Sequence, residues 1–266
     1  MMDVAIIILS KNEKLHIKRC LERIAELSAR QVFVVDCFSS DGCDKVAADT
    51  GATVVYHEWP GNQAAQFNWA LDNLPIEANW VLRLDADEYL DPGAIQWLKA
   101  DLDGIDSTVG AIEFTLERKF MGGEIRHGTN GIRMVRMFRK GRGRYANTLM
   151  DERIVYEGEK LAAPVIFYDD NLNSLEWWKE KHRSYAKREA EMAINGRANK
   201  NKRLYYRLPP YFRAVVYFSI RYFLKLGFLD GVAGFKWHFW QGLWYRCLVD
   251  REIGWMKRSK RSKCII

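Results

Sequence analysis

Long uncharged hydrophobic runs are missing from this chain of 266 residues. A membrane-spanning helix needs about 18 consecutive apolar residues, and no segment reaches that length. The most apolar part of the chain is interrupted by charged side chains, namely Arg213, Arg221, Lys225, Asp230 and Lys236. The first apolar run, residues 4–9, is short and follows Asp3 rather than cations. We therefore expect neither a spanning helix nor a secretory signal.

Cysteine is scarce, and glycine-rich phosphate motifs are absent. The five cysteines are odd in number and show no C-x-x-C pairing, which argues against a disulfide framework and a thiolate zinc site. A reducing cytosol is the compartment that such cysteine usage favours. The sequence has no G-x-G-x-x-G and no G-K-[ST], which excludes a dinucleotide fingerprint and a P-loop. Any bound phosphate must therefore be neutralised by other groups.

The composition is that of a globular protein with an uneven distribution of charge. Hydrophobic residues make up 48% and charged residues 28%, which excludes a disordered chain. Residues 1–170 hold 20 Lys and Arg against 27 Asp and Glu, whereas residues 171–266 hold 21 against 7, so the net charges are −7 and +14. We predict an acidic domain over residues 1–170 and a basic appendage over residues 171–266, with a polyanionic partner such as a membrane surface or a nucleic acid.

Strand and helix patterns alternate in the first hundred residues. Short runs rich in β-branched residues indicate buried strands, and apolar residues at helical spacing indicate amphipathic helices. The predicted strands are residues 4–9, 32–35, 53–56 and 80–84, and the predicted helices are residues 17–28, 43–50 and 63–73. This order predicts an α/β fold with a mostly parallel sheet flanked by helices. Such sheets bind ligands at the carboxyl ends of their strands.

Polar residues follow three of the four predicted strands. Ser10 and Glu13 come after the first strand, Asp36 after the second, and Asp85 and Asp87 after the fourth. Asp85 and Asp87 are two residues apart, so both carboxylates project to one side of an extended segment. Hard oxygen ligands in this place suit Mg²⁺ or Mn²⁺. Each motif taken alone also fits a solvated acidic turn, and Asp36 alone fits a cap on the turn that follows it.

Three segments resemble the N-terminal motifs of family 2 glycosyltransferases, which have a GT-A (Rossmann-like) fold. They are Ile6–Glu13, Val34–Asp41 and Leu82–Glu88. The resemblance implies that a nucleotide-diphosphate sugar binds at the strand ends together with Mg²⁺ or Mn²⁺. The residues implied at the nucleotide are Ser10, Glu13, Asp36 and Asp85, and those implied at the metal are Asp85 and Asp87.

A looser match concerns residues 59–68, which resemble bacterial lipooligosaccharide and exopolysaccharide transferases. In that subset Gln66 and Asn68 would lie at the nucleotide, and a helix N-terminus with polar faces is the alternative interpretation. Residues 223–235 resemble the tail of the same transferases. The Q-x-x-R-W pentapeptide of processive members is missing, which predicts that one sugar is added per visit. Direct in-line displacement, as the resemblance implies, inverts the anomeric configuration.

Sugar transfer also needs a base that takes the proton of the acceptor hydroxyl. The resemblance implies a carboxylate pair at this place in the chain, and we assign Asp151 as the base with Glu152 second. A surface acidic pair is the alternative. Arg133 and Arg136 are candidates to clamp a phosphate or an acceptor anion, with plain surface pairing as the alternative for Arg136. His127 is a further candidate for acceptor contact.

The last hundred residues are basic and aromatic. A helix is predicted over residues 176–193 and another over residues 211–226, and sixteen Phe, Tyr and Trp lie between residues 205 and 255. Such residues fit an interfacial helix on anionic lipid, single-stranded nucleic acid, or packing as core with solvated cations. We favour lipid, because the apolar stretch is longer than a stacking platform requires. The residues predicted at the membrane are Arg213, Arg221, Lys225, Trp237 and Trp240.

Together these patterns predict a bacterial enzyme on the cytoplasmic face of the cell membrane. It would move one sugar from a nucleotide-diphosphate sugar, a UDP-sugar, to a lipid-linked saccharide such as one carried on polyprenyl pyrophosphate. The pathway expected is the synthesis of cell-surface polysaccharide or lipopolysaccharide. A non-catalytic module that binds nucleotide or nucleic acid through the basic aromatic region is the alternative.

Overall fold

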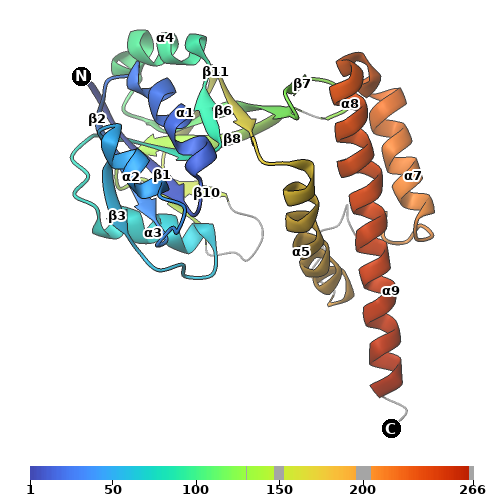
Figure 1. Cartoon of the computed structure of the whole chain (residues 1–266). Helices are drawn as coiled ribbons and strands as arrows, with labels where there is room; N and C mark the ends of the chain where they lie inside the picture. Colours follow the sequence, from blue (N-terminus) through green and yellow to red (C-terminus); the bar gives the residue numbers. More distant parts are fainter. Residues whose placement is uncertain (130, 147–152, 196–204, 264–266) are drawn as a thin grey trace. The chain divides into compact units, whose positions relative to one another are not determined.

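The computed structural model describes residues 1–129, 131–146, 153–195 and 205–263, which form two units (Figure 1). The first unit comprises Met1–Arg118 and Gly131–Leu172, and the second comprises Lys119–Asn130 and Asn173–Ile266. The sequence predicted one boundary after residue 170. The structure adds residues 119–130 to the second unit, because His127 and Gly128 in this insertion bond to Asp230 and Lys225.

One sheet organises the first unit. Its strands are β1 (Met2–Ser10), β2 (Ala29–Asp36), β3 (Thr53–Tyr56), β4 (Trp80–Asp85), β5 (Glu88–Leu90), β6 (Val109–Phe120), β8 (Ile132–Arg139) and β11 (Glu159–Asp170). Their order is β3-β2-β1-β4-β8-β6-β11-β5. The strands from β3 to β4 are parallel, whereas β4 with β8, β8 with β6 and β11 with β5 are antiparallel. The predicted α/β class and its parallel strands are confirmed.

Helices cover both faces of this sheet (Figure 1). They are α1 (Lys14–Ala25), α2 (Cys43–Asp49), α3 (Gln63–Asn73) and α4 (Pro92–Asp101), followed by the short 3₁₀ turn η1 (Leu102–Gly104). Alternate side chains of β1 enter opposite layers, since Ile6 and Ile8 pack on the side of α1, α2 and α4, and Ile7 and Leu9 on the side of α3. This two-sided burial is the reason that the first strand reads as a continuous apolar run.

A β-bulge interrupts the antiparallel half of the sheet. Ile112 of β6 pairs with Met137 of β8, but the next residue, Glu113, pairs with Val135, so Arg136 has no partner on β6. A bulge inserts one residue and reverses the alternation of side chains beyond it. Arg133 and Arg136 are three residues apart, and the bulge allows both to face the same side of the sheet.

A two-stranded sheet completes the first unit. It consists of β9 (Gly143–Tyr145) and β10 (Ile154–Tyr156), which pair antiparallel. Asn68 of α3 fastens β9, because its side-chain amide donates to the carbonyl of Tyr145 at 3.0 Å and its carbonyl accepts from the Tyr145 N–H at 2.9 Å. Residues 147–152, between β9 and β10, lie outside the described residues.

The second unit is mainly helical. Its elements are β7 (Gly123–Ile125), α5 (Leu175–Ile194), α7 (Phe212–Ser219), the π-helical turn η2 (Ile220–Leu224), the 3₁₀ turn η3 (Gly227–Asp230), α8 (Gly231–Trp237), the π-helical turn η4 (His238–Trp244) and α9 (Tyr245–Lys263). The predicted helix over residues 176–193 is confirmed as α5. The helix predicted over residues 211–226 is interrupted, because α7 ends at Ser219 and η2 follows. None of the described helices is long and apolar enough to cross a membrane.

Packing of α5 against α9 forms the core of this unit. Ala186 and Ala190 contact Tyr245 and Val249 in one hydrophobic cluster. Within the same interface, the buried Glu189 accepts hydrogen bonds from the hydroxyl of Tyr245 at 2.8 Å and from Arg246 at 2.9 Å. Buried charge is tolerated here because each carboxylate oxygen has a donor.

Three residues predicted at the membrane are buried instead. Arg213 is 3% exposed and pairs with Asp250 of α9, and Arg221 is 7% exposed and donates to the carbonyl of Gly128. Trp237 is 5% exposed and packs in the cluster with Phe120 and Trp178. The prediction was wrong for these three residues, because a helical pattern shows which side chains share a face but not what packs against that face.

Candidate active site

A cleft of about 710 Å³ opens in the first unit beside the carboxyl end of β4. Its walls come from the start of α3, from β4, β6, β8, β9 and β10, and from the first residues of β11. The lining residues are Gln63, Arg83, Asp85, Glu113, Arg133, Met134, Val135, Arg136, Tyr145, Arg153, Ile154, Val155, Tyr156 and Lys160. Three predicted site residues, Asp85, Arg133 and Arg136, therefore meet in one cleft.

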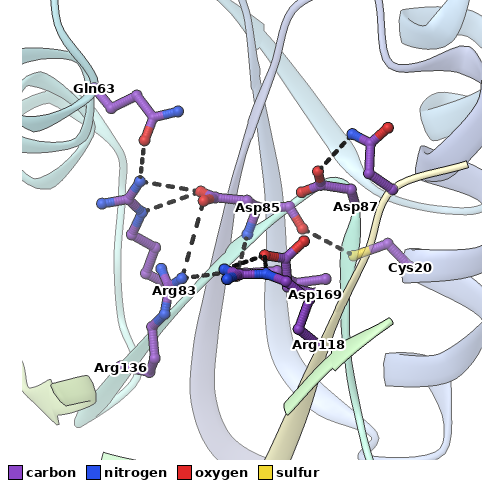
Figure 2. Close-up of polar contacts among 10 residues, drawn as sticks. Cys20, Gln63, Arg83, Asp85, Asp87, Arg118, Arg136 and Asp169 are labelled. Carbon is purple, nitrogen blue, oxygen red and sulfur yellow. Dashed lines mark hydrogen bonds and ion pairs between the residues drawn. The ribbon is translucent and has the colours of Figure 1, made fainter. Parts of the chain in front are cut away.

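Asp85 is held by two arginines (Figure 2). Arg83 donates to its Oδ1 from Nη2 at 3.0 Å and from Nε at 3.3 Å, and Arg136 Nη2 lies 3.9 Å from Oδ2. Gln63 in turn accepts from Arg83 at 2.7 Å. The carboxylate is partly exposed, and these donors fix its direction at the cleft wall.

A buried ion pair between Arg136 and Glu88 stabilises the position of Asp85. Arg136 pairs with Glu88, and the other carboxylate oxygen of Glu88 accepts the backbone N–H of Asp85 at 2.9 Å. Burial raises the pKa of Glu88, whereas the charge of Arg136 opposes that shift. Glu88 thus positions both Arg136 and the backbone of Asp85. Arg136, predicted as a clamp for phosphate or acceptor, is 6% exposed and already paired.

Asp87 has several other carboxylates as neighbours. Its Oδ2 accepts from the Asn171 side chain at 2.9 Å. Burial raises the pKa of Asp87 to about 6, and the negative charges of Asp169, Asp85 and Glu13 act in the same direction. A carboxylate that is crowded in this way is stabilised by a cation. Asp87 is therefore the group in this site best placed to bind one.

The donor set fits Mg²⁺ or Mn²⁺. Asp85 and Asp87 offer hard carboxylate oxygens, and the charge on Asp87 is not fully compensated by the protein. Among the residues that the structure describes, no group of three or more His, Cys, Asp or Glu side chains converges as a metal cage. The chain would supply one or two ligands and leave the other positions to water and substrate oxygens, as Mg²⁺ sites commonly do.

Glu13 belongs to a chain of hydrogen bonds at the start of α1. The backbone N–H of Leu172 donates to His16 Nε2 at 2.9 Å, so the proton of this imidazole lies on Nδ1. Nδ1 then donates to Glu13 Oε2 at 2.6 Å. His16 is 1% exposed, so it links the last residues of the first unit to the carboxylate predicted in the nucleotide pocket.

Asp36 and Ser10 are buried beneath the strand ends. Asp36 is 0% exposed and accepts from the backbone N–H and the hydroxyl of Ser39 at 2.7 and 2.6 Å. Ser10 is 3% exposed, with Oγ 3.2 Å from Cys43 Sγ. Asp36 therefore caps the turn after β2, which was the alternative interpretation, and neither side chain is open to a nucleotide in this conformation.

An exposed aromatic pair lies beside this turn. Phe38 is 57% exposed, and its ring stacks on Tyr56 of β3 with centroids 5.6 Å apart. Phe38 has a φ of 56°, which turns the backbone sharply after β2. Flat exposed rings are surfaces on which a nucleotide base stacks. This pair was not predicted from the sequence, although Phe38 is visible there two residues after the end of β2.

Gln66 and Asn68 have structural contacts rather than an open position. Gln66 is 0% exposed, and its carbonyl oxygen lies 2.7 Å from His57 Nδ1. Asn68 is occupied by the backbone of Tyr145. The expectation that both contact the nucleotide is corrected here, because their polar groups already have partners inside the protein.

Asp151 and Glu152, predicted as the base pair, lie outside the described residues. The neighbouring Arg153 is described and lines the cleft, as does Tyr145 on the paired strand. Arg83, Arg153 and Lys160 are cleft residues that the sequence analysis missed. Arg83 had a signal in the sequence: it is the one charged residue within the apolar run of β4 and shares the alternation of Asp85.

Comparison with protein-family models assigns the chain to a family. Residues 5–150 match the model of glycosyl transferase family 2. Mannosyl-3-phosphoglycerate synthase from Rubrobacter xylanophilus is 22% identical over 45% of this chain and 42% of its own, with a TM-score of 0.37. Glucosyl-3-phosphoglycerate synthase from Mycobacterium tuberculosis, in complex with Mn²⁺ and uridine diphosphate, is 20% identical over 42% and 43%, with a TM-score of 0.35. These alignments span less than half of each structure, and no curated protein matches.

Proposed function

Because the chain belongs to glycosyl transferase family 2, we propose that it moves one sugar from a nucleotide-diphosphate sugar, a UDP-sugar, to a saccharide hydroxyl with the help of Mg²⁺ or Mn²⁺. The observation that carries this proposal is Asp87, a crowded carboxylate two residues after Asp85 at the end of a buried strand. Asp85 and its arginines open onto the cleft, which leaves room for a sugar.

Different residues of the site would bind the nucleotide-sugar donor and the acceptor. A divalent cation held by Asp87 and Asp85 would neutralise the leaving diphosphate. Asn171 orients Asp87, and Arg83 orients Asp85. The exposed pair of Phe38 and Tyr56 offers a stacking surface for the base.

The acceptor hydroxyl loses its proton during transfer. We propose that Asp151 is the general base that accepts this proton and that Glu152 is the second candidate, because the adjacent Arg153 lines the cleft. Attack opposite to the leaving diphosphate inverts the anomeric configuration. With no processive motif in the sequence, the product leaves after one addition.

We further propose a lipid-linked saccharide as acceptor, at the inner face of the bacterial cell membrane, in the synthesis of cell-surface polysaccharide or lipopolysaccharide. The support is an apolar surface on the second unit. Its members are more than a third exposed: Val215, Ile220, Phe223, Leu224, Leu226, Phe228, Leu229, Val232 and Phe235. Within residues 208–236 the acidic Asp230 is buried, whereas Lys225 is exposed and Lys236 partly exposed. Apolar side chains flanked by lysines, without exposed carboxylates, fit an anionic lipid surface.

A transfer assay with UDP-sugars and Mn²⁺ tests the catalytic proposal. We expect Asp87→Asn and Asp151→Asn each to lower turnover by at least about a hundredfold, since a metal ligand and a general base contribute that much or more. Asp72→Asn is the control, because Asp72 is a surface carboxylate paired with Arg144 outside the cleft. Full activity of either site variant would overturn its assignment.

A further inference from the structure

The cleft carries more positive charge than its own carboxylates balance. Five cationic side chains line it against two carboxylates, those of Asp85 and Glu113. The cations are Arg83, Arg133, Arg136, Arg153 and Lys160. Three of them are paired: Arg83 with Asp85, Arg136 with Glu88, and Lys160 with Glu113 at 2.6 Å.

The other two cations of the cleft, both guanidinium groups, have no carboxylate partner in the described part of the chain. Arg133 and Arg153 form no ion pair or side-chain hydrogen bond with any residue in the described part of the chain, and both are exposed at the cleft. The bulge in β8 turns Arg133 to the cleft side, and Arg153 directly precedes β10. Arginine binds phosphate and carboxylate through paired N–H donors, so two unpaired arginines beside a lysine form a receptor for an anion.

We propose that Arg133 and Arg153, with Lys160, bind a phosphate or carboxylate group of the acceptor. This inference rests on the proposed function and names its acceptor class: an anionic saccharide. The diphosphate of the donor already has a place, at the cation on Asp87. Arg153 directly follows Asp151 and Glu152, the residues proposed above to take the proton of the acceptor hydroxyl. The molecule that carries that hydroxyl is therefore the one whose charge reaches Arg153.

The walls of the cleft suit this class of molecule. Tyr145 and Tyr156 border it, and aromatic side chains pack against sugar rings while their hydroxyls bond to polar groups. The guanidinium of Arg83 lies 4.5 Å from the centre of the Tyr145 ring, which holds that ring in place. A sugar against the partly exposed Tyr156 and an anion on the arginines would fill both kinds of surface.

Inorganic phosphate serves as the probe, and the protein is first saturated with UDP and Mn²⁺. Calorimetric titration at low salt should show phosphate binding to the loaded wild type. Arg133→Gln and Arg153→Gln should each raise the phosphate Kd about tenfold or more, since a charged hydrogen bond is lost. Arg153→Lys should recover part of that loss. Arg144→Gln is the matched control, because Arg144 lies on β9 but pairs with Asp72 and does not line the cleft.

Each outcome has one meaning. Unchanged UDP affinity in both variants, together with weaker phosphate binding, supports the acceptor assignment. Displacement of UDP by phosphate, or weaker UDP binding in the variants, would assign the arginines to the donor and overturn the proposal. Absence of phosphate binding to the wild type would also overturn it. A wild type that binds neither UDP nor another nucleotide with Mn²⁺ contradicts the proposed function, and a phosphate titration without nucleotide still tests the cleft.

Discussion

At the scale of the residue, two aspartates that look alike in the sequence have different environments. Asp85 is paired with Arg83 and partly exposed. Burial, followed by the charges of neighbouring carboxylates, raises the pKa of Asp87 to about 6, and a single amide donor, Asn171, opposes this shift. Environment separates the roles of two carboxyl groups at one site. Asp85 is the carboxylate whose direction is fixed by arginines, and Asp87 is the carboxylate whose negative charge the protein compensates least.

Metal binding should therefore depend on pH. The folded pKa of Asp87 is about 6 against an ordinary value of 3.8, so this carboxyl is protonated at pH 5 and ionised at pH 7.5. A protonated carboxyl does not bind a metal. We expect Mn²⁺ to raise Tm at pH 7.5 and to have much less effect at pH 5. Equal Tm increases at both pH values, or an increase retained in Asp87→Asn, would contradict this assignment.

His238 of the second unit has a pKa that is shifted in the opposite direction. It is 0% exposed, and burial, followed by the positive charge of Arg221, lowers its pKa to about 4. The unfolded chain takes up a proton on this histidine below about 6.5, whereas the folded chain does not until about 4. The folded state therefore has its full stability above pH 6.5 and loses this contribution as the pH falls from 6.5 to 4.

His238→Phe removes that titration. We expect the Tm of the wild type to fall relative to the variant between pH 7.5 and pH 5, measured by thermal unfolding in low salt. His182→Phe is the comparison, because His182 is partly exposed and stacked on Trp178. If the two Tm curves of wild type and His238→Phe run parallel over this range, the burial of a neutral histidine does not control acid stability here.

At the scale of the element, the partners of a helix or strand decide which face is functional. The pattern of residues 211–226 places its cations on one arc, but α9 supplies Asp250, which buries Arg213. In the same way the pattern of β8 would separate Arg133 from Arg136, and the bulge against β6 brings them to one side. Both outcomes depend on a second element that is distant in the sequence.

The ion pair between α7 and α9 should dominate the stability of the second unit. Asp250 is 3% exposed and also accepts the Tyr211 N–H at 2.7 Å. Asp250→Ala leaves Arg213 buried and unpaired, so we expect a loss of about 3–5 kcal/mol in the free energy of unfolding. Urea unfolding of the variant measures it. Arg213→Met with Asp250→Leu should recover most of the loss, and no recovery would mean that the charges themselves are required.

At the scale of the whole molecule, the net charge of +7 hides two regions with different chemistry. Residues 1–170, with a charge of −7, contain the carboxylates of the site. Residues 171–266, with a charge of +14, contain sixteen of the twenty-four exposed large hydrophobic residues in the described part of the chain. An acidic catalytic region needs a divalent cation to accept a diphosphate, and a basic apolar region suits an anionic lipid surface.

Membrane binding should depend on the apolar surface itself. We expect Leu224→Glu with Val232→Glu to lower the fraction of protein that floats with vesicles of anionic phospholipid by about tenfold, because each change removes apolar burial and adds repulsion. Leu224 and Val232 are 77% and 71% exposed, so the fold should not suffer. Leu15→Glu, at an exposed leucine of α1, is the control. Binding to RNA with a steep salt dependence, and none to vesicles, would instead favour a nucleic-acid partner.

The sequence by itself determined the local elements and the principal motifs. Four strands, three intervening helices and α5 follow from periodicity, and Asp85 and Asp87 follow from their position after a buried strand. Three short motifs also indicated the family, glycosyl transferase family 2, and the family model confirms it. These features depend on neighbours within a few residues, which is why a linear pattern carries them.

Tertiary structure alone decided which polar groups are open to a substrate. Distant elements supply the partners of Gln66 and Arg213, and Arg153 and Lys160 come together in the cleft only in the folded chain. The residues next to a side chain in the sequence do not show which distant group becomes its hydrogen-bond partner. Burial and pairing are fixed when distant strands and helices pack, and the free charges that remain after this pairing define the site.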